Sequence, residues 1–376
     1  MLTLFKNVDV YAPEPLGRKD ILISGERIVE IDEGIDESAV RSLNGDVFDL
    51  GESYAVPGFV DGHVHLIGGG GEGGFSTRTP EGSAQQFAEV GTTTVVGMLG
   101  TDGVTRDHAS LLAKVRDFRN FGIDSYMLTG SYRYPLKTLT GDVMRDIVFI
   151  PEIIGVGEVA ISDHRSSNLS STELQRFAMD ARVAGMLSGK AGVTVLHLGD
   201  GQEKLKPLYE AVADGTLNPR QIIPTHICRS EGLLNQGIDW VSNRGGYIDI
   251  TANEYSTHLV LEDIYSKKIR FDRICVSSDG LGSLPRFDDE KNLVGIRSAP
   301  VDTLFKTFTT LVKDRGLPIH EALKPFTANP AAFYHLHRNG IGLLKRGGSA
   351  NILFIDRDFQ IVEVISSGRS TLENRG

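Results

Sequence analysis

Two histidines stand one residue apart at the end of an apolar run, in the segment GFVDGHVHL that begins at Gly58. On a β-strand, residues i and i+2 project to the same face, so the imidazoles of His63 and His65 can reach one metal ion. Taken alone, this HxH triplet is weak evidence, because a pair of exposed histidines has the same pattern. It predicts a metal site only together with further ligands.

Further potential ligands follow other apolar runs. His197 lies in VLHLGD, His226 in PTHICR and Asp279 in VSSDG. Each of these residues, taken singly, is equally consistent with a buried histidine or a turn-forming aspartate. Together with the HxH pair they form a mixed set of nitrogen and oxygen ligands, which suits zinc or another borderline divalent metal. The set therefore predicts a metal centre.

Five protein ligands exceed what one tetrahedral zinc ion binds, which favours two metal ions with a shared ligand. Glu158 in GVGEVAISD is the expected bridging carboxylate, because it is the only acid that we place at a comparable strand end in the middle of the chain. A buried ion pair with an arginine is the alternative for Glu158. Two such metals would activate water and polarise a carbonyl, and Asp279 would move the proton.

The elements that must position these residues are short apolar runs that alternate with helix-like stretches, as in βα units. Residues 110–121, 172–188 and 233–244 have apolar residues three and four positions apart, as in amphipathic helices. We predict a TIM-like (β/α)8 barrel with its active site at the carboxyl ends of the strands, and an open doubly wound sheet is the alternative. The expected strands begin at Gly58, Thr92, Ser125, Ile153, Val193, Ile222, Tyr247 and Ile274.

The two ends of the chain differ from its middle. Residues 1–56 contain strand-like runs and no long helix, and the tail from about residue 341 contains two more such runs. Neither flank alone could bury one face of a sheet. We therefore predict a small β-sandwich domain made of residues 1–56 and 341–376, beside a barrel domain of residues 57–340.

Composition excludes several classes of protein. Lys and Arg total 39 and Asp and Glu total 49, which gives a net charge of −10, so neither nucleic acid nor an anionic membrane is an expected partner. The apolar runs are shorter than the roughly 18 residues of a membrane span, and the start of the chain does not resemble a signal peptide. Two cysteines, Cys228 and Cys275, are too few for a disulfide scaffold or a cysteine-based zinc site, which favours the cytoplasm.

At these residues the sequence resembles the amidohydrolase superfamily, whose pattern is HxH on strand 1, an acid on strand 4, histidines on strands 5 and 6 and Asp on strand 8. The resemblance covers the whole chain. Within the superfamily it is strongest to the isoaspartyl dipeptidases, in segments such as HVHLIGGGGEGG, VVGMLGTD, LTGSY, AISDHRS and SSDGLGS. It implies a hydrolase that binds two divalent metal ions, with zinc expected, and that forms a large homo-oligomer such as an octamer.

The resemblance also implies residue roles. A β-aspartyl dipeptide carries one ammonium group and two carboxylates, so its pocket needs an acid and cationic donors. Tyr132 in TGSY would stabilise the oxyanion. The implied substrate-binding residues are Glu72 and Thr101 for the ammonium group, and Arg165, Arg229 and Ser283 for the carboxylates. Surface salt bridges are the alternative for the arginines.

One position departs from the family pattern. Many members bridge their metals with a carbamylated lysine, whereas this sequence has Glu158, and an extra residue in the GVGE segment is expected to accommodate the shorter side chain. Lys190 is a conceivable substitute ligand, but it lies before strand 5 and is expected in a loop. Since no lysine is available for carbamylation, activity should not depend on bicarbonate. Residues 282–298 are expected to form a loop on which the preference for the leaving residue depends.

The predicted function is the hydrolysis of β-aspartyl dipeptides, which are small-molecule substrates, to aspartate and an amino acid. The alternative enzyme is a cyclic-amide hydrolase of the dihydroorotase or hydantoinase type. The alternative from another class is a catalytically silent barrel that acts as a binding or assembly protein.

Overall fold

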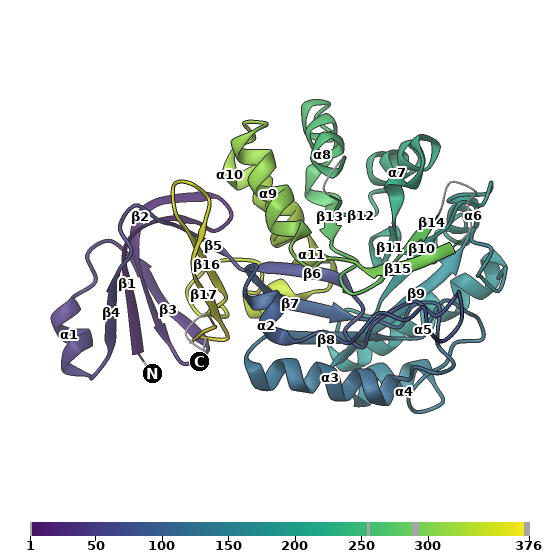
Figure 1. Ribbon diagram of the computed structural model, residues 1–376, viewed down its shortest axis with the longest axis horizontal. Helices are drawn as coiled ribbons and strands as arrows, with labels where there is room; N and C mark the ends of the chain where they lie inside the picture. Colours follow the sequence, from purple (N-terminus) through teal and green to yellow (C-terminus); the bar gives the residue numbers. More distant parts are fainter. Residues whose placement is uncertain (1, 254–255, 288–292, 372–376) are drawn as a thin grey trace.

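A computed structural model describes residues 2–253, 256–287 and 293–371 (Figure 1). The expected barrel strands are present as β6 (Phe59–Val64), β7 (Thr92–Gly97), β8 (Asp124–Thr129), β9 (Ile153–Ile161), β10 (Val193–Leu198), β11 (Ile222–Thr225), β12 (Ile248–Thr251) and β13 (Ile274–Ser277). Strands β6 to β11 form one parallel sheet in chain order, and β12 pairs with β13. Since β12 also lies beside β11 and β13 beside β6, the strands follow one another around a TIM-like barrel, as the sequence predicts.

Helices lie outside the strands (Figure 1). Their ends carry the expected signals: in α5, Ser170 and Glu173 form a capping box, and Gly189 ends the helix in the left-handed conformation. The helices are α2 (Ala84–Ala88), α3 (His108–Phe121), α4 (Val143–Phe149), α5 (Ser171–Ser188), α6 (Lys206–Ala211), α7 (Glu231–Arg244), α8 (Thr257–Ser266), α9 (Thr303–Lys313), α10 (Ile319–Leu323) and α11 (Ala328–Phe333). Among the described residues we find no helix with the length and apolar content needed to cross a membrane.

Both ends of the chain meet in one mixed sheet of eight strands. Its strands are β1 (Leu2–Tyr11), β2 (Pro15–Ser24), β3 (Arg27–Asp32), β4 (Asp46–Asp49), β5 (Tyr54–Pro57), β16 (Ile352–Ile355), β17 (Ile361–Ser366) and β18 (Arg369–Ser370), with α1 (Glu37–Ser42) beside them. The junction is the antiparallel pairing of β5 with β16. Phe5, Ile21 and Phe354 are among the side chains that form its core. The sandwich arrangement and the domain limits at residues 57 and 340 stay predictions.

Residues 282–298, expected to form a loop, contain a hairpin instead. β14 (Ser283–Phe287) and β15 (Leu293–Ser298) pair antiparallel, with Ser283 opposite Ser298. Sequence reasoning missed these strands because they are short and lack a clear alternation of apolar and polar residues. The hairpin matters for function because Ser283 is one of the predicted site residues.

Candidate active site

The predicted histidine and aspartate ligands lie at the carboxyl ends of barrel strands. His63 and His65 lie at the end of β6, and His197 lies near the end of β10. His226 and Asp279 follow β11 and β13 in the left-handed conformation, with φ of 60° and 52°. Positive φ is uncommon for residues other than glycine and clusters at functional sites. The strand ends therefore bring all five side chains to one end of the barrel.

A β-bulge in β9 aims Glu158 into this group. Gly157 and Glu158 together lie opposite the single residue Val195 of β10, because the register of the two strands shifts there. Bulges re-aim side chains beside active sites. The Glu158 side chain is only 1% exposed. In this pairing β9 thus has one residue more than β10, and Glu158 lies in the resulting bulge.

The two carboxylate oxygens of Glu158 face two different sets of histidines. Oε1 lies 3.4 Å from His63 Nε2 and 3.5 Å from His65 Nε2. Oε2 lies 2.9 Å from His197 Nδ1 and 3.6 Å from His226 Nε2. This is the arrangement that a carboxylate needs to bridge two cations, one at each oxygen.

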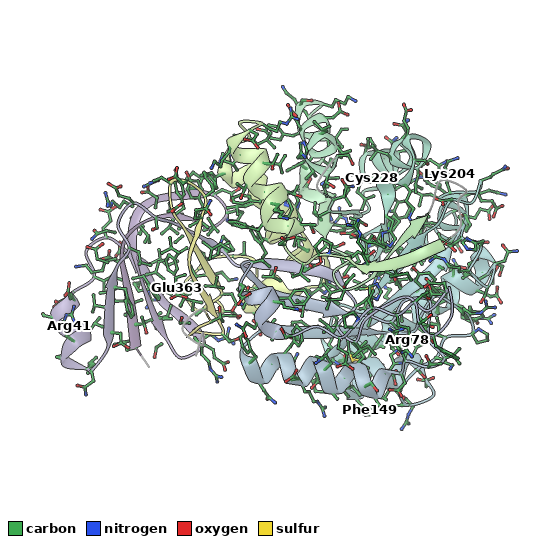
Figure 2. The ribbon with its side chains drawn as sticks, in the orientation of Figure 1. Arg41, Arg78, Phe149, Lys204, Cys228 and Glu363 are labelled. Atoms are coloured by element: carbon green, nitrogen blue, oxygen red, sulfur yellow. The ribbon has the colours of Figure 1, made fainter. Side chains whose placement is uncertain are left out.

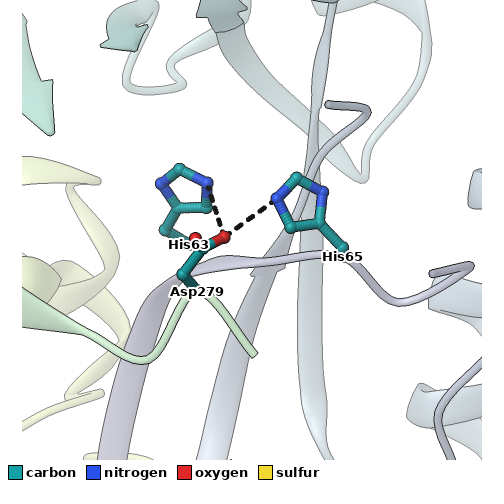
Figure 3. Close-up of side chains that lie close together, drawn as sticks. All are labelled: His63, His65 and Asp279. Carbon is teal, nitrogen blue, oxygen red and sulfur yellow. Dashed lines mark ion pairs between the residues drawn. The ribbon is translucent and has the colours of Figure 1, made fainter. Parts of the chain in front are cut away.

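Asp279 completes the first set of ligands. Its Oδ1 lies 3.0 Å from His65 Nε2 and 3.6 Å from His63 Nε2 (Figure 3). Within each of two triplets, potential ligand atoms lie within 4.8 Å of one another: His63, His65 and Asp279, and His63, Glu158 and His226. The two triplets share His63, so these potential ligand atoms form one continuous cluster.

Several of these buried polar atoms lack a hydrogen-bond partner among the described residues. They include both ring nitrogens of His63, Nδ1 of His65 and Oε1 of Glu158. Most buried polar groups in proteins are paired, because an unpaired one costs about 1–3 kcal/mol. Imidazole nitrogens and carboxylate oxygens are ligands that zinc and similar cations bind. The donor set and its unpaired atoms therefore fit divalent metal ions.

The electrostatics keep both site carboxylates ionised. Burial would raise the pKa of Glu158, but the nearby charges of His63 and His197 outweigh burial and hold this pKa well below its usual value. Burial likewise opposes ionisation of Asp279, but the hydrogen bond from His65 and the charge of His63 lower its pKa. Both carboxylates are therefore in the deprotonated form that binds metal, whereas His63, whose pKa, despite burial, the Glu158 carboxylate raises to about 10, would give up its proton when a cation takes over this charge balance.

Glu72, Thr101 and Arg165 lie together on one side of the ligands. Thr101 Oγ1 donates a hydrogen bond of 2.9 Å to Glu72 Oε1, and Arg165 Nη1 donates one of 3.2 Å to the same oxygen. Arg165 Nη2 also lies 3.2 Å from His197 Nε2. The predicted ammonium-binding acid therefore adjoins the candidate metal ligands and already pairs with a guanidinium.

A cavity of about 580 Å³ opens beside the ligands. Arg229 and Ser283 line it together with His226 and Asp279. Cys228, near α7 in Figure 2, lines it as well. The volume lies within the range of small-molecule sites, roughly 300–1,000 Å³. The cavity can therefore hold a dipeptide-sized ligand beside the candidate metal ligands His226 and Asp279.

Tyr132 follows β8 and packs against His197. Its hydroxyl oxygen lies 2.8 Å from His197 Nδ1, and the residue is 6% exposed. Burial raises the pKa of Tyr132 well above its ordinary value. The hydroxyl therefore keeps its proton at neutral pH and can donate a hydrogen bond.

Asp163, which the sequence analysis missed, also reaches the site. It lies two residues beyond β9, and its side chain is 2% exposed and contacts Arg165 and His197. The expectation that Glu158 is the only strand-end acid in the middle of the chain was therefore wrong. Asp163 was overlooked because an aspartate just after a strand is typical of a turn. Arg165, two residues later in AISDHRS, was the available signal.

Lys190 does not belong to the group of ligands. It lies between α5 and β10, and its Nζ donates a 3.1 Å hydrogen bond to the Ile153 carbonyl oxygen at the start of β9. It also contacts the carbonyl oxygens of Ile147 and Ile150. Because the start of β9 is the end remote from Glu158, Lys190 cannot replace the bridging acid. Its loop position is as expected.

Comparison with solved structures reveals a similar protein. A β-aspartyl dipeptidase from the thermophilic, keratin-degrading Fervidobacterium islandicum AW-1, in complex with the β-Asp-Leu dipeptide, is 40% identical in sequence. The match covers 98% of this chain and 96% of that chain, with a TM-score of 0.91.

Two further relatives match over shorter segments. An adenine deaminase of Cenarchaeum symbiosum is 29% identical over 40% of this chain and 24% of its own length. A dihydroorotase of Staphylococcus aureus strain Mu50 is 32% identical over 43% of this chain and 35% of its own length. The matches thus span about a quarter and a third of these relatives. Residues 46–215 match the model of the amidohydrolase family, and with the nearly full-length match above, the chain belongs to that family.

Proposed function

We propose that this protein hydrolyses β-aspartyl dipeptides to aspartate and an amino acid. The observation that carries the proposal is the placement of Glu158 between two sets of histidines, beside a cavity that Arg229 and Ser283 line. The likeness to an enzyme whose structure holds β-Asp-Leu supports the substrate class. Membership of the amidohydrolase family supports hydrolysis of an amide bond.

The reaction would depend on two divalent metal ions, with zinc expected. When bound, such ions activate water near neutral pH and polarise a carbonyl group. Glu158 would be shared between them, since each of its oxygens faces one set of histidines. The proposed ligands are His63, His65, Glu158, His197, His226 and Asp279.

Charged side chains would hold the two ends of the substrate. Glu72, assisted by Thr101, would bind the ammonium group, while Arg165, Arg229 and Ser283 would bind the carboxylates. The Glu72–Arg165 ion pair supports these roles, because a substrate with both charges can pair with both partners.

Tyr132 and Asp279 would take part in the chemical steps. The protonated hydroxyl of Tyr132 would donate a hydrogen bond to the carbonyl oxygen as that oxygen gains negative charge. Asp279, ionised and lining the cavity, would accept a proton from the attacking water and pass it to the leaving amine.

The test compares β-Asp-Leu with α-Asp-Leu as substrates of the zinc-loaded protein, with release of leucine as the readout. We expect cleavage of the β isomer alone. Glu72→Gln should raise KM about 10- to 100-fold, because a hydrogen bond to a charged group is worth about 1.5–3 kcal/mol. Glu81→Gln is the matched control, since Glu81 is an exposed glutamate that pairs with Lys114.

The alternative enzyme is a cyclic-amide hydrolase, which the partial likeness to dihydroorotases favours. If the metal-loaded protein cleaves neither dipeptide, the β-aspartyl assignment fails. Dihydroorotate and hydantoins would then be the substrates to test.

The proposal extends to the state of the protein in the cell. We infer a cytoplasmic homo-oligomer, an interpretation that the family resemblance and the two cysteines support. Light scattering coupled to gel filtration measures the oligomer, and a monomeric mass would contradict this part of the proposal.

A further inference from the structure

Asp163 is a buried carboxylate that none of the roles above uses. Its Oδ1 accepts a 2.9 Å hydrogen bond from Arg165 Nε, and its Oδ2 accepts a 2.8 Å hydrogen bond from Arg165 Nη2. The backbone N–H of Arg165 donates a third bond, of 2.7 Å, to Oδ1. Such a two-pronged pairing fixes the plane as well as the position of the guanidinium. Asp163 therefore determines where Arg165 points.

The same carboxylate reaches a proposed metal ligand. Asp163 Oδ2 lies 3.3 Å from His197 Nε2, while the other ring nitrogen, Nδ1, lies 2.9 Å from Glu158 Oε2. Arg229 Nη1 lies 3.9 Å from the same Oδ2. One carboxylate thus contacts a ligand histidine and both arginines that are proposed to bind the substrate.

The two ring nitrogens of His197 need different partners. A histidine that binds a metal through one nitrogen carries its proton on the other, and a carboxylate at that second nitrogen fixes the tautomer. Glu158 lies at Nδ1, so Nδ1 is the nitrogen on the side of the ligands and Nε2 is the one that should be protonated.

Arg165 would oppose that tautomer without Asp163. Its Nη2 lies 3.2 Å from His197 Nε2 and can only donate, so it favours an unprotonated Nε2. Asp163 Oδ2 accepts from Arg165 Nη2 and also offers an acceptor to a protonated Nε2. Asp163 therefore offers an acceptor both to the arginine and to the protonated imidazole, whose N–H groups would otherwise repel each other.

We propose that Asp163 is a positioning residue that couples the metal centre to the substrate-binding arginines. It holds His197 with Nε2 toward Asp163 and Nδ1 toward Glu158, where an unprotonated Nδ1 would bind a metal ion, and it holds Arg165 in the orientation that would bind a substrate carboxylate. The role of Asp163 in orienting Arg165 for the substrate rests on the proposed function, whereas its role in orienting His197 for metal binding does not. The competing view is that Asp163 only stabilises the fold through a buried ion pair.

Asp163→Asn tests the proposal because it removes the charge and retains the size. Loss of such a carboxylate partner typically weakens metal binding 10- to 100-fold. After dialysis against a weak chelator, the variant should hold about one ion per chain where the wild type holds two, measured by atomic emission. The cobalt-substituted variant should show an altered visible spectrum, and KM for β-Asp-Leu should rise at least tenfold.

Asp146→Asn is the matched control. Asp146 is fully buried and accepts hydrogen bonds from Thr129, Leu139 and Thr140, away from the ligands. The Asp146→Asn variant should be less stable than the wild type, but its metal content and its cobalt spectrum should be unchanged. Two ions per chain, a wild-type spectrum and an unchanged KM in Asp163→Asn would overturn the proposal.

Two further outcomes are possible: the Asp163→Asn variant does not fold, or the wild-type protein does not cleave the dipeptide. If circular dichroism shows that Asp163→Asn is unfolded, Asp163→Glu, which moves the charge outward by one methylene, receives the same measurements. The proposal then requires weaker metal binding and a raised KM, and wild-type values for both would refute it. If wild-type protein binds two ions but does not cleave β-Asp-Leu, the proposed function fails, and metal content and spectrum still decide the role of Asp163.

Discussion

Glu158 joins the two halves of the proposed metal centre through its two oxygens. Oε1 faces His63 and His65, and Oε2 faces His197 and His226. The side chain is almost fully buried, so its charge depends on cationic neighbours for stability. A short carboxylate can occupy this position because the bulge in β9 carries it toward the ligands.

The first prediction concerns the charge of this residue. Glu158→Gln keeps the size but leaves one side-chain oxygen and no negative charge, so it cannot bridge two cations. We expect fewer than two zinc ions per chain by atomic emission and at least a hundredfold loss of β-Asp-Leu hydrolysis, since removing an essential catalytic group commonly costs 10²–10⁴-fold. Glu152→Gln is the control, because Glu152 is also buried but pairs with Arg116 before β9 begins.

A second measurement on the wild type addresses the same residue. Metal-depleted protein reloaded with zinc should regain the same activity with and without bicarbonate, because the bridging group is a glutamate and needs no carbamylation. Marked activation by bicarbonate, or two tightly bound ions in Glu158→Gln, would contradict the bridging role.

At the scale of the element, the bulge in β9 requires a glycine. Gly157 has φ of 154°, and a Cβ atom there would lie 2.8 Å from Val195 Cβ and 3.0 Å from the Val195 carbonyl oxygen. Real Cβ atoms essentially never approach another atom below 3.0 Å. β9 and β10 would therefore have to separate where Glu158 is held.

The second prediction follows from that close approach. Gly157→Ala should lower the free energy of unfolding by about 1–3 kcal/mol, the usual cost of a strained backbone residue, and should also reduce the zinc content. Gly189→Ala is the control: Gly189 has φ of 71°, but no described atom lies within 4 Å of the position that a Cβ atom would take there. It should cost about 1–2 kcal/mol and leave the zinc content unchanged, and equal zinc contents in the two variants would refute the link to Glu158.

Elements were more predictable from the sequence than contacts between them. The eight barrel strands could be predicted because buried parallel strands are continuous apolar runs, and their ends located the histidines. The hairpin of β14 and β15 could not be predicted, because its strands are short and of mixed polarity. The contact of Asp163 with His197 could not be predicted either, because it joins the loop after β9 to strand β10 through a tertiary contact that no local pattern encodes.

At the scale of the whole molecule, the terminal sheet and the barrel are joined by polar contacts as well as by β5, which leads directly into β6 (Figure 1). Asn351, just before β16, is 2% exposed. Its Nδ2 donates a 2.8 Å hydrogen bond to Asp124 at the start of β8, and its Oδ1 accepts a 2.7 Å bond from the Ser367 backbone. Burial raises the pKa of Asp124 above its ordinary value. The Asn351 side chain therefore links the start of β16 and the residue after β17 to the start of barrel strand β8.

The third prediction makes this junction sensitive to pH. Asn351→Asp would place a second carboxylate against Asp124, which raises the pKa of both acids in the folded protein above the values in the unfolded chain. Between those values the folded protein binds more protons than the unfolded chain, so its stability falls as pH rises. Urea unfolding should show that the free energy of unfolding falls by about 3–5 kcal/mol at pH 7.5, as for an uncompensated buried charge, and by clearly less at pH 5.

Asn351→Ala is the control, because it removes the hydrogen bonds without adding a charge. Its free energy of unfolding should fall by about 1–3 kcal/mol at both pH values. The repulsion between the two carboxylates acts only where the terminal sheet meets the barrel. If Asn351→Asp lowers the free energy of unfolding equally at both pH values, the carboxylates do not repel each other. The sheet and the barrel would then have separated enough for water to enter the junction.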